Sequence, residues 1–216
     1  GIYTWAQVHY YRRFNLPAYS SWMRKCHQAL PRMYYILDQL LVKDAPLRFI
    51  DSTMLPVCRL VRSERHKVTK GTADYGKNHQ GWWYGFKLHA ACNPKGQLCA
   101  IRFTPANESD SQQIPHLIND ATRVAVGDGG YTASVMRRKM WQEHHTYILS
   151  PPHPKQAKKV LTQWQLLLLQ ARPKIECTFD YLKEHLLLVT SFPRSVNGYA
   201  VHYIRVLLSY QLAWGF

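Results

Sequence analysis

The stretch LRFIDSTMLPV, residues 47–57, constrains the fold most, because it alternates as a strand does and carries an acid in its middle. Phe49, Asp51, Thr53 and Leu55 share one face of such a strand, since successive side chains point to opposite faces. Pro56 cannot donate a backbone hydrogen bond and should end regular pairing. Asp51 therefore lies mid-strand, where an unpaired carboxylate is costly.

The segments that follow predict an α/β fold. The stretch FKLHAACNPKGQLCAIRFT reads as a hairpin, and Asn93-Pro94-Lys95-Gly96 suits a type I turn. The other expected elements are an exposed, mobile, positive loop over 59–82, a helix over 109–121, a strand ending at Asp128, a helix near 133–143, a strand over 146–150, a basic helical segment over 155–170 and helices from Pro173 and over 196–214. Antiparallel strands followed by βαβ-type units predict a mixed sheet flanked by helices.

The length of 216 residues suggests one domain, or one domain with a small appendage. Residues 1–45 are expected to be helical and basic, with Pro46 as the boundary to an α/β domain over 46–216. Aromatic and basic side chains alternate in this N-terminal region, as they do in surfaces that bind nucleic acid. A helical core with a solvated face explains the same pattern.

The charge balance points to a polyanion partner. Lys and Arg number 28 against 13 Asp and Glu, a net charge of +15. Nucleic acid is the first candidate partner, an anionic membrane the second, and a basic protein with no such partner is the third reading. No apolar run approaches the roughly 20 residues that a membrane span needs, and there is no signal segment. The five cysteines form no C-x-x-C pair, which argues against a structural zinc site and for a reducing compartment.

Two further acids occur in patterned surroundings. Asp128 follows a β-branched run within VGDGGY, where a plain Asp-Gly turn is the simpler reading. Glu176 lies in RPKIECTFDYLK, on a helix with a buried stripe. Arg172, four residues before it, and Lys183, seven residues after it, fall on the same helix face. An i,i+4 ion pair plus a distant lysine explains that spacing as well.

Three carboxylates that converge in a basic protein repel one another unless a cation lies between them. Mg²⁺ takes oxygen ligands and keeps waters and phosphates in its shell, and Mn²⁺ is the expected substitute. Two such ions about 4 Å apart can activate a nucleophile and stabilise a leaving oxygen on phosphate. The acids at Asp51, Asp128 and Glu176 therefore suggest metal-dependent phosphoryl transfer on DNA.

At this point a family resemblance is visible. The chain resembles the DDE transposases of bacterial insertion sequences, most closely insertion sequence family 982 within the broader family-4-like group. The resemblance covers about residues 47 to 212 and rests on these motifs in order: FIDSTMLPV, GWWYGFKLHAACNPKGQL, TPANESDSQQIPHL, VGDGGY and RPKIECTFDYLK.

The resemblance implies a ribonuclease H-like catalytic domain over 46–216, with residues 1–45 as a partial helical, DNA-end-binding region. Asp51, Asp128 and Glu176 would be the catalytic metal ligands of a two-metal Mg²⁺ site, and Arg172 and Lys183 would contact DNA ends. The broader group has a tyrosine where this chain has Leu169, which fits the proposed subfamily better.

The implied activity is cleavage at insertion-sequence ends and strand transfer into target DNA, with no covalent protein intermediate. The implied partners are double-stranded DNA, as transposon ends and target, and a second copy of the chain, since two ends are handled together. The implied location is the bacterial cytoplasm, at the nucleoid when bound to DNA.

Other side chains are weaker candidates. His66, Lys67, Lys87 and His89 could touch DNA or orient a metal ligand, or be ordinary surface and sheet residues. Ser109 or Asp110, in ESDS, is expected to cap the helix over 109–121.

Two rival functions stay open. The first is a catalytically inactive or truncated transposase remnant that only binds DNA; the start at Gly1 and the short N-terminal region favour it, and the intact acids oppose it. The second is a stand-alone nuclease without strand transfer.

Overall fold

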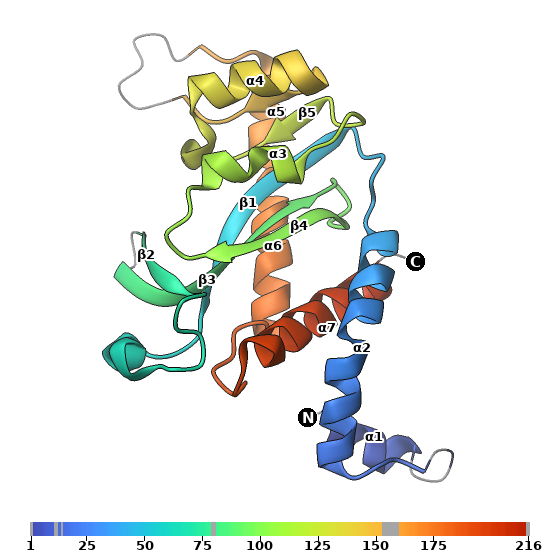
Figure 1. Cartoon of the computed structure of the whole chain (residues 1–216). Coiled ribbons are helices and arrows are strands. Elements are labelled where there is room, and N and C mark those ends of the chain that lie inside the picture. Colours follow the sequence, from blue (N-terminus) through green and yellow to red (C-terminus); the bar gives the residue numbers. More distant parts are fainter. Residues whose placement is uncertain (1, 11–12, 14, 79–80, 153–159, 215–216) are drawn as a thin grey trace.

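The structure is a computed structural model that describes residues 2–10, 13, 15–78, 81–152 and 160–214 (Figure 1). Its centre is a six-stranded mixed sheet with strand order β2-β3-β1-β5-β6, and β4 pairs with β3 outside that path. The strands are β1 (Leu47–Pro56), β2 (Asp74–Asn78), β3 (Gly81–Cys92), β4 (Leu98–Pro105), β5 (Val124–Val126) and β6 (Tyr147–Leu149). This confirms the expected mixed sheet flanked by helices.

The antiparallel and parallel parts of the sheet meet at β1. β3 pairs antiparallel with β1, β2 and β4, whereas β5 pairs parallel with β1 and β6. The β3–β4 hairpin turns where expected, and Gly96 takes a φ of +90°, which glycine adopts without strain. β1 ends at Pro56, as its missing N–H predicts.

Helices cover both faces of the sheet (Figure 1). The helices are α1 (Ile2–Tyr10), α2 (Tyr19–Leu40), α3 (Ile114–Leu117), α4 (Ser134–His144), α5 (Gln163–Ala171), α6 (Pro173–Asp180) and α7 (Val196–Trp214). One core joins α2, α6 and α7 to the sheet face that carries Phe49 and Leu88. A second core joins α3 and α4 to the opposite face, which carries Ile50 and Ala91.

Two expectations about local structure are wrong. Residues 59–82 are not one loop, because they contain a 3-10 helix at Leu60–Arg65 and strand β2, which pairs with β3. The helix expected over 109–121 is reduced to a 3-10 helix at Asp110–Gln113 and the single turn of α3. The chain becomes extended at Ile118 and then turns, with the Thr122 N–H donating to the Asn119 carbonyl.

Of the basic helical segment expected over 155–170, residues 155–159 lie outside the described part of the chain. In the described remainder the helix begins at Gln163, behind a capping box made by Thr162 and Gln165.

The N-terminal region is helical and shares the core of the α/β domain. Leu37 of α2 is fully buried in the same core as α7. Gln211 of α7 donates to the carbonyl of Leu40, and its side-chain oxygen accepts from the Leu98 N–H. The boundary at residue 45 therefore does not separate two cores. Across the described residues, no helix is long and apolar enough to cross a membrane.

Candidate active site

The strand register brings Asp51 and Asp128 level with each other. Phe49 of β1 pairs with Val126, the last residue of β5, and the two strands run parallel. Each acid lies two residues beyond that pair, Asp51 within β1 and Asp128 in the turn after β5. Side chains two residues apart point to the same face of a strand. Two acids that are 77 positions apart by their numbers thus come to the same level, just beyond the point where the pairing of β1 with β5 ends.

Asp51 is largely buried and partly paired. Its Oδ1 accepts the Ser52 N–H at 2.8 Å, and its Oδ2 is 3.3 Å from Nη2 of Arg172. The side chain of Asp51 is 16% exposed, and that of Arg172 is 18% exposed. The carboxylate in mid-strand therefore has the partner that its burial requires.

Glu176 joins the site through the same arginine. Arg172 lies at the junction of α5 and α6, where Pro173 begins the second helix because its first position needs no N–H. Nη1 of Arg172 is 2.6 Å from Oε1 of Glu176, four residues on. The predicted i,i+4 pair is present, and the guanidinium also reaches across to Asp51, so it bridges two of the three acids. Its Nε is buried with no partner among the described residues.

The pKa of Asp51 is raised by its burial and altered by its charged neighbours. Burial, the largest cause, raises the pKa of Asp51 to about 6 from the ordinary 3.8. The Ser52 N–H and the Arg172 charge act against this rise, whereas the charges of Asp128 and Glu176 add to it. All three acids and Arg172 therefore act electrostatically at one place.

Asp128 is held by its own turn. Its Oδ1 accepts the Gly130 N–H at 2.8 Å, so it caps the 3-10 helix at Gly129–Tyr131. The neighbouring Gly127 packs against the Tyr131 ring, and an added Cβ would lie 2.6 Å from a ring carbon. The glycines let the backbone pass close to the buried tyrosine and to the carboxylate.

Lys183 lies on the turn that continues α6. Residues Tyr181–His185 form a π-helical turn, a feature that often occurs at functional sites. Burial lowers the pKa of Lys183, while the charges of Asp180, Glu184 and Asp51 oppose that shift. The charge of Asp51 therefore acts on the ammonium of Lys183.

The remaining DNA candidates lie in different surroundings. His66 packs against the Tyr84 ring with a centroid distance of 6.2 Å, and its Nδ1 is 3.1 Å from Oγ1 of Thr69. Lys67, beside it, is exposed. Lys87 is only 14% exposed, and its ammonium donates to Asp110 at 3.1 Å. Arg172 thus contacts two of the acids, Lys183 interacts with Asp51 through its charge, and His66 packs against Tyr84 of β3.

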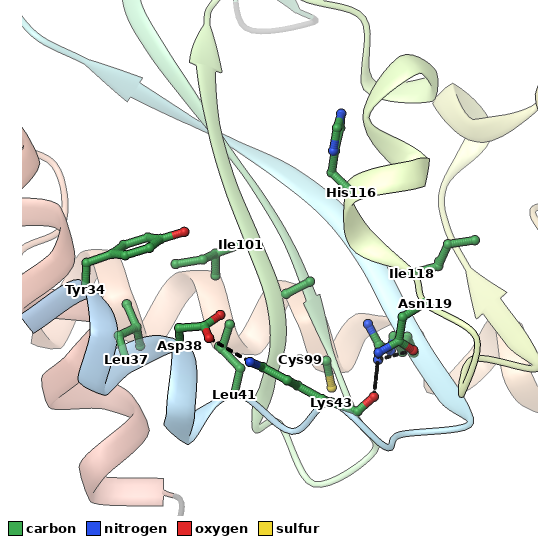
Figure 2. Close-up of a pocket in the computed structure, with 12 residues that line it drawn as sticks. Tyr34, Leu37, Asp38, Leu41, Lys43, Cys99, Ile101, His116, Ile118 and Asn119 are labelled. Atoms are coloured by element: carbon green, nitrogen blue, oxygen red, sulfur yellow. Dashed lines mark hydrogen bonds and ion pairs between the residues drawn. The ribbon is translucent and has the colours of Figure 1, made fainter. Parts of the chain in front are cut away.

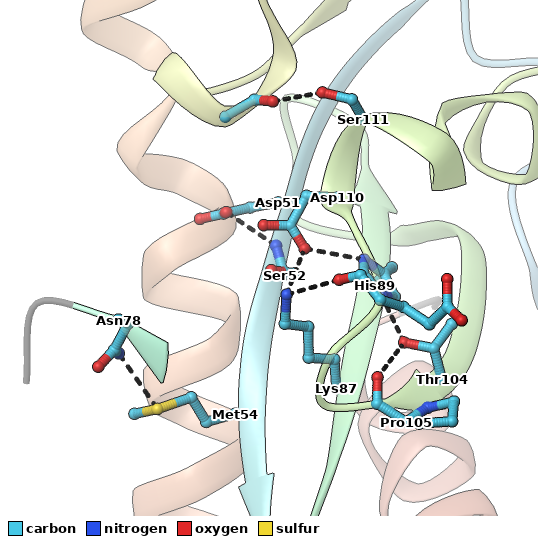
Figure 3. Close-up of polar contacts among 12 residues, drawn as sticks. Asp51, Ser52, Met54, Asn78, Lys87, His89, Thr104, Pro105, Asp110 and Ser111 are labelled. Carbon is cyan, nitrogen blue, oxygen red and sulfur yellow. Dashed lines mark hydrogen bonds and ion pairs between the residues drawn. The ribbon is translucent and has the colours of Figure 1, made fainter. Parts of the chain in front are cut away.

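A polar cluster on the other face of β1 from Asp51 was not recognised from the sequence. Figure 3 shows Lys87 and His89 of β3 directed at Asp110, and Ser52, the register partner of His89, lies next to them. Of the two cap candidates, Ser109 and Asp110, the structure places Ser109 at the N-cap position, and its side chain makes no capping bond. The alternation of β3 carried a signal, since Lys87 and His89 share one face of a strand that is otherwise apolar there.

A cavity elsewhere is separate from these residues. It has a volume of about 220 Å³ and lies between α2, β4 and the segment after α3 (Figure 2). Tyr34, Asp38, Lys43 and Asn119 are among its lining residues, and none of the candidate site residues lines it.

The donor chemistry of the three acids fits a hard divalent cation, which prefers carboxylate oxygens. In the described part of the chain, however, no group of three or more His, Cys, Asp or Glu side chains is close enough to hold a metal ion. Arg172 supplies the positive charge between Asp51 and Glu176. The three carboxylates are thus the right kind of ligand for a metal ion. In this structure the Arg172 guanidinium neutralises the acids as a bound cation would.

The mixed sheet, its flanking helices, the acid within β1 and the acid just after β5 are the features of a ribonuclease H-like DDE domain. The sequence matches the transposase DDE domain family over residues 42–196, and the chain belongs to that family. Neither the curated proteins nor the solved structures contain a significant match.

Membership defines the general role. The chain carries a transposase domain, and such domains bind DNA, act on it as enzymes and generally use divalent metals. The narrower assignment to insertion sequence family 982 stays a prediction.

Proposed function

We propose that this domain cleaves DNA at insertion-sequence ends and joins the freed ends to target DNA in a Mg²⁺-dependent reaction. The observation that supports this most is the level placement of Asp51 and Asp128 beyond the Phe49–Val126 pair, with Arg172 linking Asp51 to Glu176. That arrangement combines a small acidic site with cations that can hold a phosphate.

Asp51, Asp128 and Glu176 are the proposed metal ligands, with Mn²⁺ as a substitute ion. When bound, a pair of such ions activates the attacking oxygen and stabilises the leaving oxygen of an in-line displacement at phosphorus. Because phosphoryl transfer needs mainly positioning and charge, the protein contributes by holding the carboxylates and the DNA strand.

Arg172 and Lys183 are proposed to hold a phosphate of the DNA backbone. An arginine guanidinium can hold two phosphate oxygens at once, whereas a lysine ammonium acts as a point charge. Both side chains lie beside Asp51 and are partly buried, so their charges are less screened than those of exposed residues. They would place a backbone phosphate against the acids. His66 and Lys67 are proposed as outer DNA contacts in the segment between the 3-10 helix Leu60–Arg65 and β2.

The chain is proposed to work as a homodimer in the bacterial cytoplasm, bound to the nucleoid, because two element ends must be handled together. Residues 1–45 are proposed to assist DNA-end binding, with the basic side chains of α2 facing solvent. Both statements rest on the family resemblance and on the net charge of +15.

The test is nicking of supercoiled plasmid that carries the DNA flanking the coding sequence, with Mg²⁺, Mn²⁺ or chelator. Wild type should nick with either metal, and Asp51→Asn, Asp128→Asn and Glu176→Gln should not. Glu143→Gln is the matched control, since this α4 residue is exposed and pairs with Lys139 at i,i+4, away from the candidate site residues. Mobility shifts should show equal DNA binding by all variants.

The outcomes separate the rival functions. If wild type and all variants bind DNA and none of them nicks it, the chain is a DNA-binding remnant. Nicking without joined products in the plasmid would indicate a stand-alone nuclease. Full-rate nicking by a variant that lacks one of the three acids would refute the site.

A further inference from the structure

A polar network built on one ion pair, Lys87–Asp110, lies on the opposite face of β1 from Asp51. In the β1–β3 register, Ser52 pairs with His89 and Asp51 pairs with Ala90. Paired residues share a face, so His89, and Lys87 two residues earlier, lie with Ser52 on the face away from Asp51. Asp110, at the start of the 3-10 helix Asp110–Gln113, closes this network (Figure 3).

The network anchors Asp110 to the centre of the sheet. Oδ1 of Asp110 is 3.1 Å from Nζ of Lys87 and 3.6 Å from Nδ1 of His89. The same ammonium donates to the Glu108 carbonyl at 2.8 Å, and Nε2 of His89 is 2.8 Å from Oγ1 of Thr104. The His89 ring has no exposed surface, and β3 is paired along both edges, so these partners cannot move far.

Ser111 connects this anchor to the second acid of the site. Its hydroxyl donates to the Gly130 carbonyl, and the Gly130 N–H donates to Oδ1 of Asp128 at 2.8 Å. Gly130 is therefore held on its carbonyl side by Ser111 and on its amide side by Asp128. Gly130 therefore connects the 3-10 helix that begins at Asp110 with the one that Asp128 caps.

We propose that Lys87, Asp110 and Ser111 are positioning residues that fix the direction of the Asp128 carboxylate. The inference rests on the proposed function, because it gives that carboxylate a ligand role. The turn after Asp128 contains two adjacent exposed glycines, which have the most backbone freedom of any residues. Mg²⁺ demands nearly ideal octahedral geometry, so a ligand on such a turn needs outside support.

The proposal also gives Lys87 a different role from the DNA contact expected for it. Its ammonium is directed inward, to Asp110 and Glu108, and its side chain is mostly covered. A lysine held in this way contributes to the site through Asp110 and not through a phosphate.

The test compares Ser111→Ala with Ser109→Ala, because Ser109 is two residues away and its side chain makes no capping bond. Two quantities are measured for each variant: Mn²⁺ affinity by calorimetry without DNA, and the Mg²⁺ concentration that gives half-maximal plasmid nicking. Loss of an outer partner of a metal ligand weakens metal affinity by about 10-fold or more. Ser111→Ala should therefore shift both quantities by about 10-fold, with nicking restored at saturating Mg²⁺.

Conservative replacement supplies the second arm. Ser111→Thr keeps the donor and should return both quantities to within about 2-fold of wild type, as should Ser109→Ala. Lys87→Met should weaken Mn²⁺ affinity and raise the Mg²⁺ requirement, as Ser111→Ala does. If Lys87→Met fails to fold, the comparison of Ser111→Ala with Ser111→Thr still tests the proposal. A Ser111→Ala protein with lowered Tm but wild-type metal dependence would show a merely structural contact and overturn the proposal.

The positioning role and the proposed function can be refuted separately. If wild type nicks DNA and Asp128→Asn does not, while Ser111→Ala matches wild type, only the positioning role is wrong. If wild type neither binds Mn²⁺ nor nicks DNA, the proposed function fails and the positioning role fails with it.

Discussion

Arg172 and Asp51 are 121 residues apart in the chain, yet Nη2 of the arginine lies 3.3 Å from Oδ2 of the aspartate. The other end of the same guanidinium holds Glu176 at 2.6 Å. One cation therefore keeps two acids of the candidate site together without a metal. This makes Arg172 both a support for the acids and a competitor for the ion that they are proposed to bind.

Removing that charge should strengthen metal binding and weaken the metal-free fold. In Arg172→Leu, the acids repel each other and Asp51 is left unpaired, so we expect the free energy of unfolding to fall by about 1–3 kcal/mol in chelator. Mn²⁺ affinity without DNA should rise about 3–10-fold, since a nearby positive charge no longer opposes the ion. Denaturant titration and calorimetry measure the two effects. Arg172→Lys keeps the charge and should show less of both; a fall in Mn²⁺ affinity for Arg172→Leu would contradict this account.

A methyl group at Gly130 should displace the Asp128 carboxylate. A Cβ there would lie 3.0 Å from Oδ1 of Asp128, closer than ordinary contact, whereas a Cβ at Gly129 meets nothing within 4 Å. Neither glycine has a positive φ, so backbone strain does not confuse the comparison. We expect Gly130→Ala to raise the Mg²⁺ concentration for half-maximal nicking by about 10-fold and Gly129→Ala to leave it unchanged. Equal values for the two variants would mean that the carboxylate can turn away freely.

The raised pKa of Asp51 should make the metal-free protein less stable at neutral pH than at mildly acidic pH. Folding raises this pKa from 3.8 to about 6, so between those values the folded state binds more protons than the unfolded state. The contribution of Asp51 to stability is thus greatest below pH 4 and declines as pH rises through 6, by about 3 kcal/mol in total.

Asp51→Asn removes this titration and tests its sign. In chelator at pH 7.5, the variant should be about 1–3 kcal/mol more stable than wild type, and the difference should shrink towards pH 4. Urea unfolding at several pH values measures it, with Glu143→Gln as the control for general acid effects. A difference that grows as pH falls would show that the carboxylate is stabilised, not penalised, by its surroundings.

Arg48 should matter for stability and not for chemistry. It is 1% exposed and donates to the carbonyls of Ala45, Leu117 and Lys43 and to the side chain of Asn119. These bonds tie the segment before β1 to the segment before β5, beside the cavity in Figure 2. Arg48→Met should lower the free energy of unfolding by about 2–4 kcal/mol, because several buried carbonyls lose their donor.

Thermal and urea unfolding measure this loss, and Arg102→Met on β4 is the control, since that arginine is exposed. Nicking per folded molecule should match wild type in both variants. Lost nicking in fully folded Arg48→Met would place this arginine in the mechanism after all.

Local patterns predicted much of the fold. The alternation around Asp51, the turn at Asn93–Gly96 and the stripe of Ile175 and Phe179 each depend on neighbours in the chain, and each produced the expected element. The expectations that were wrong rested on segments whose hydrophobic periodicity is weak. Residues 59–82 were read as a loop from their charge, yet β2 forms there because β3 offers an edge to pair with.

By itself, the sequence determined which residues could form strands and helices, the family resemblance, and the three acids with their flanking cations. Only the tertiary structure decided that Phe49 pairs with Val126, that Arg172 spans Asp51 and Glu176, and that Lys87 turns inward to Asp110. The reason is physical. Secondary structure follows from contacts within a few residues, whereas strand order and ion pairs over long separations follow from how the whole core packs at once.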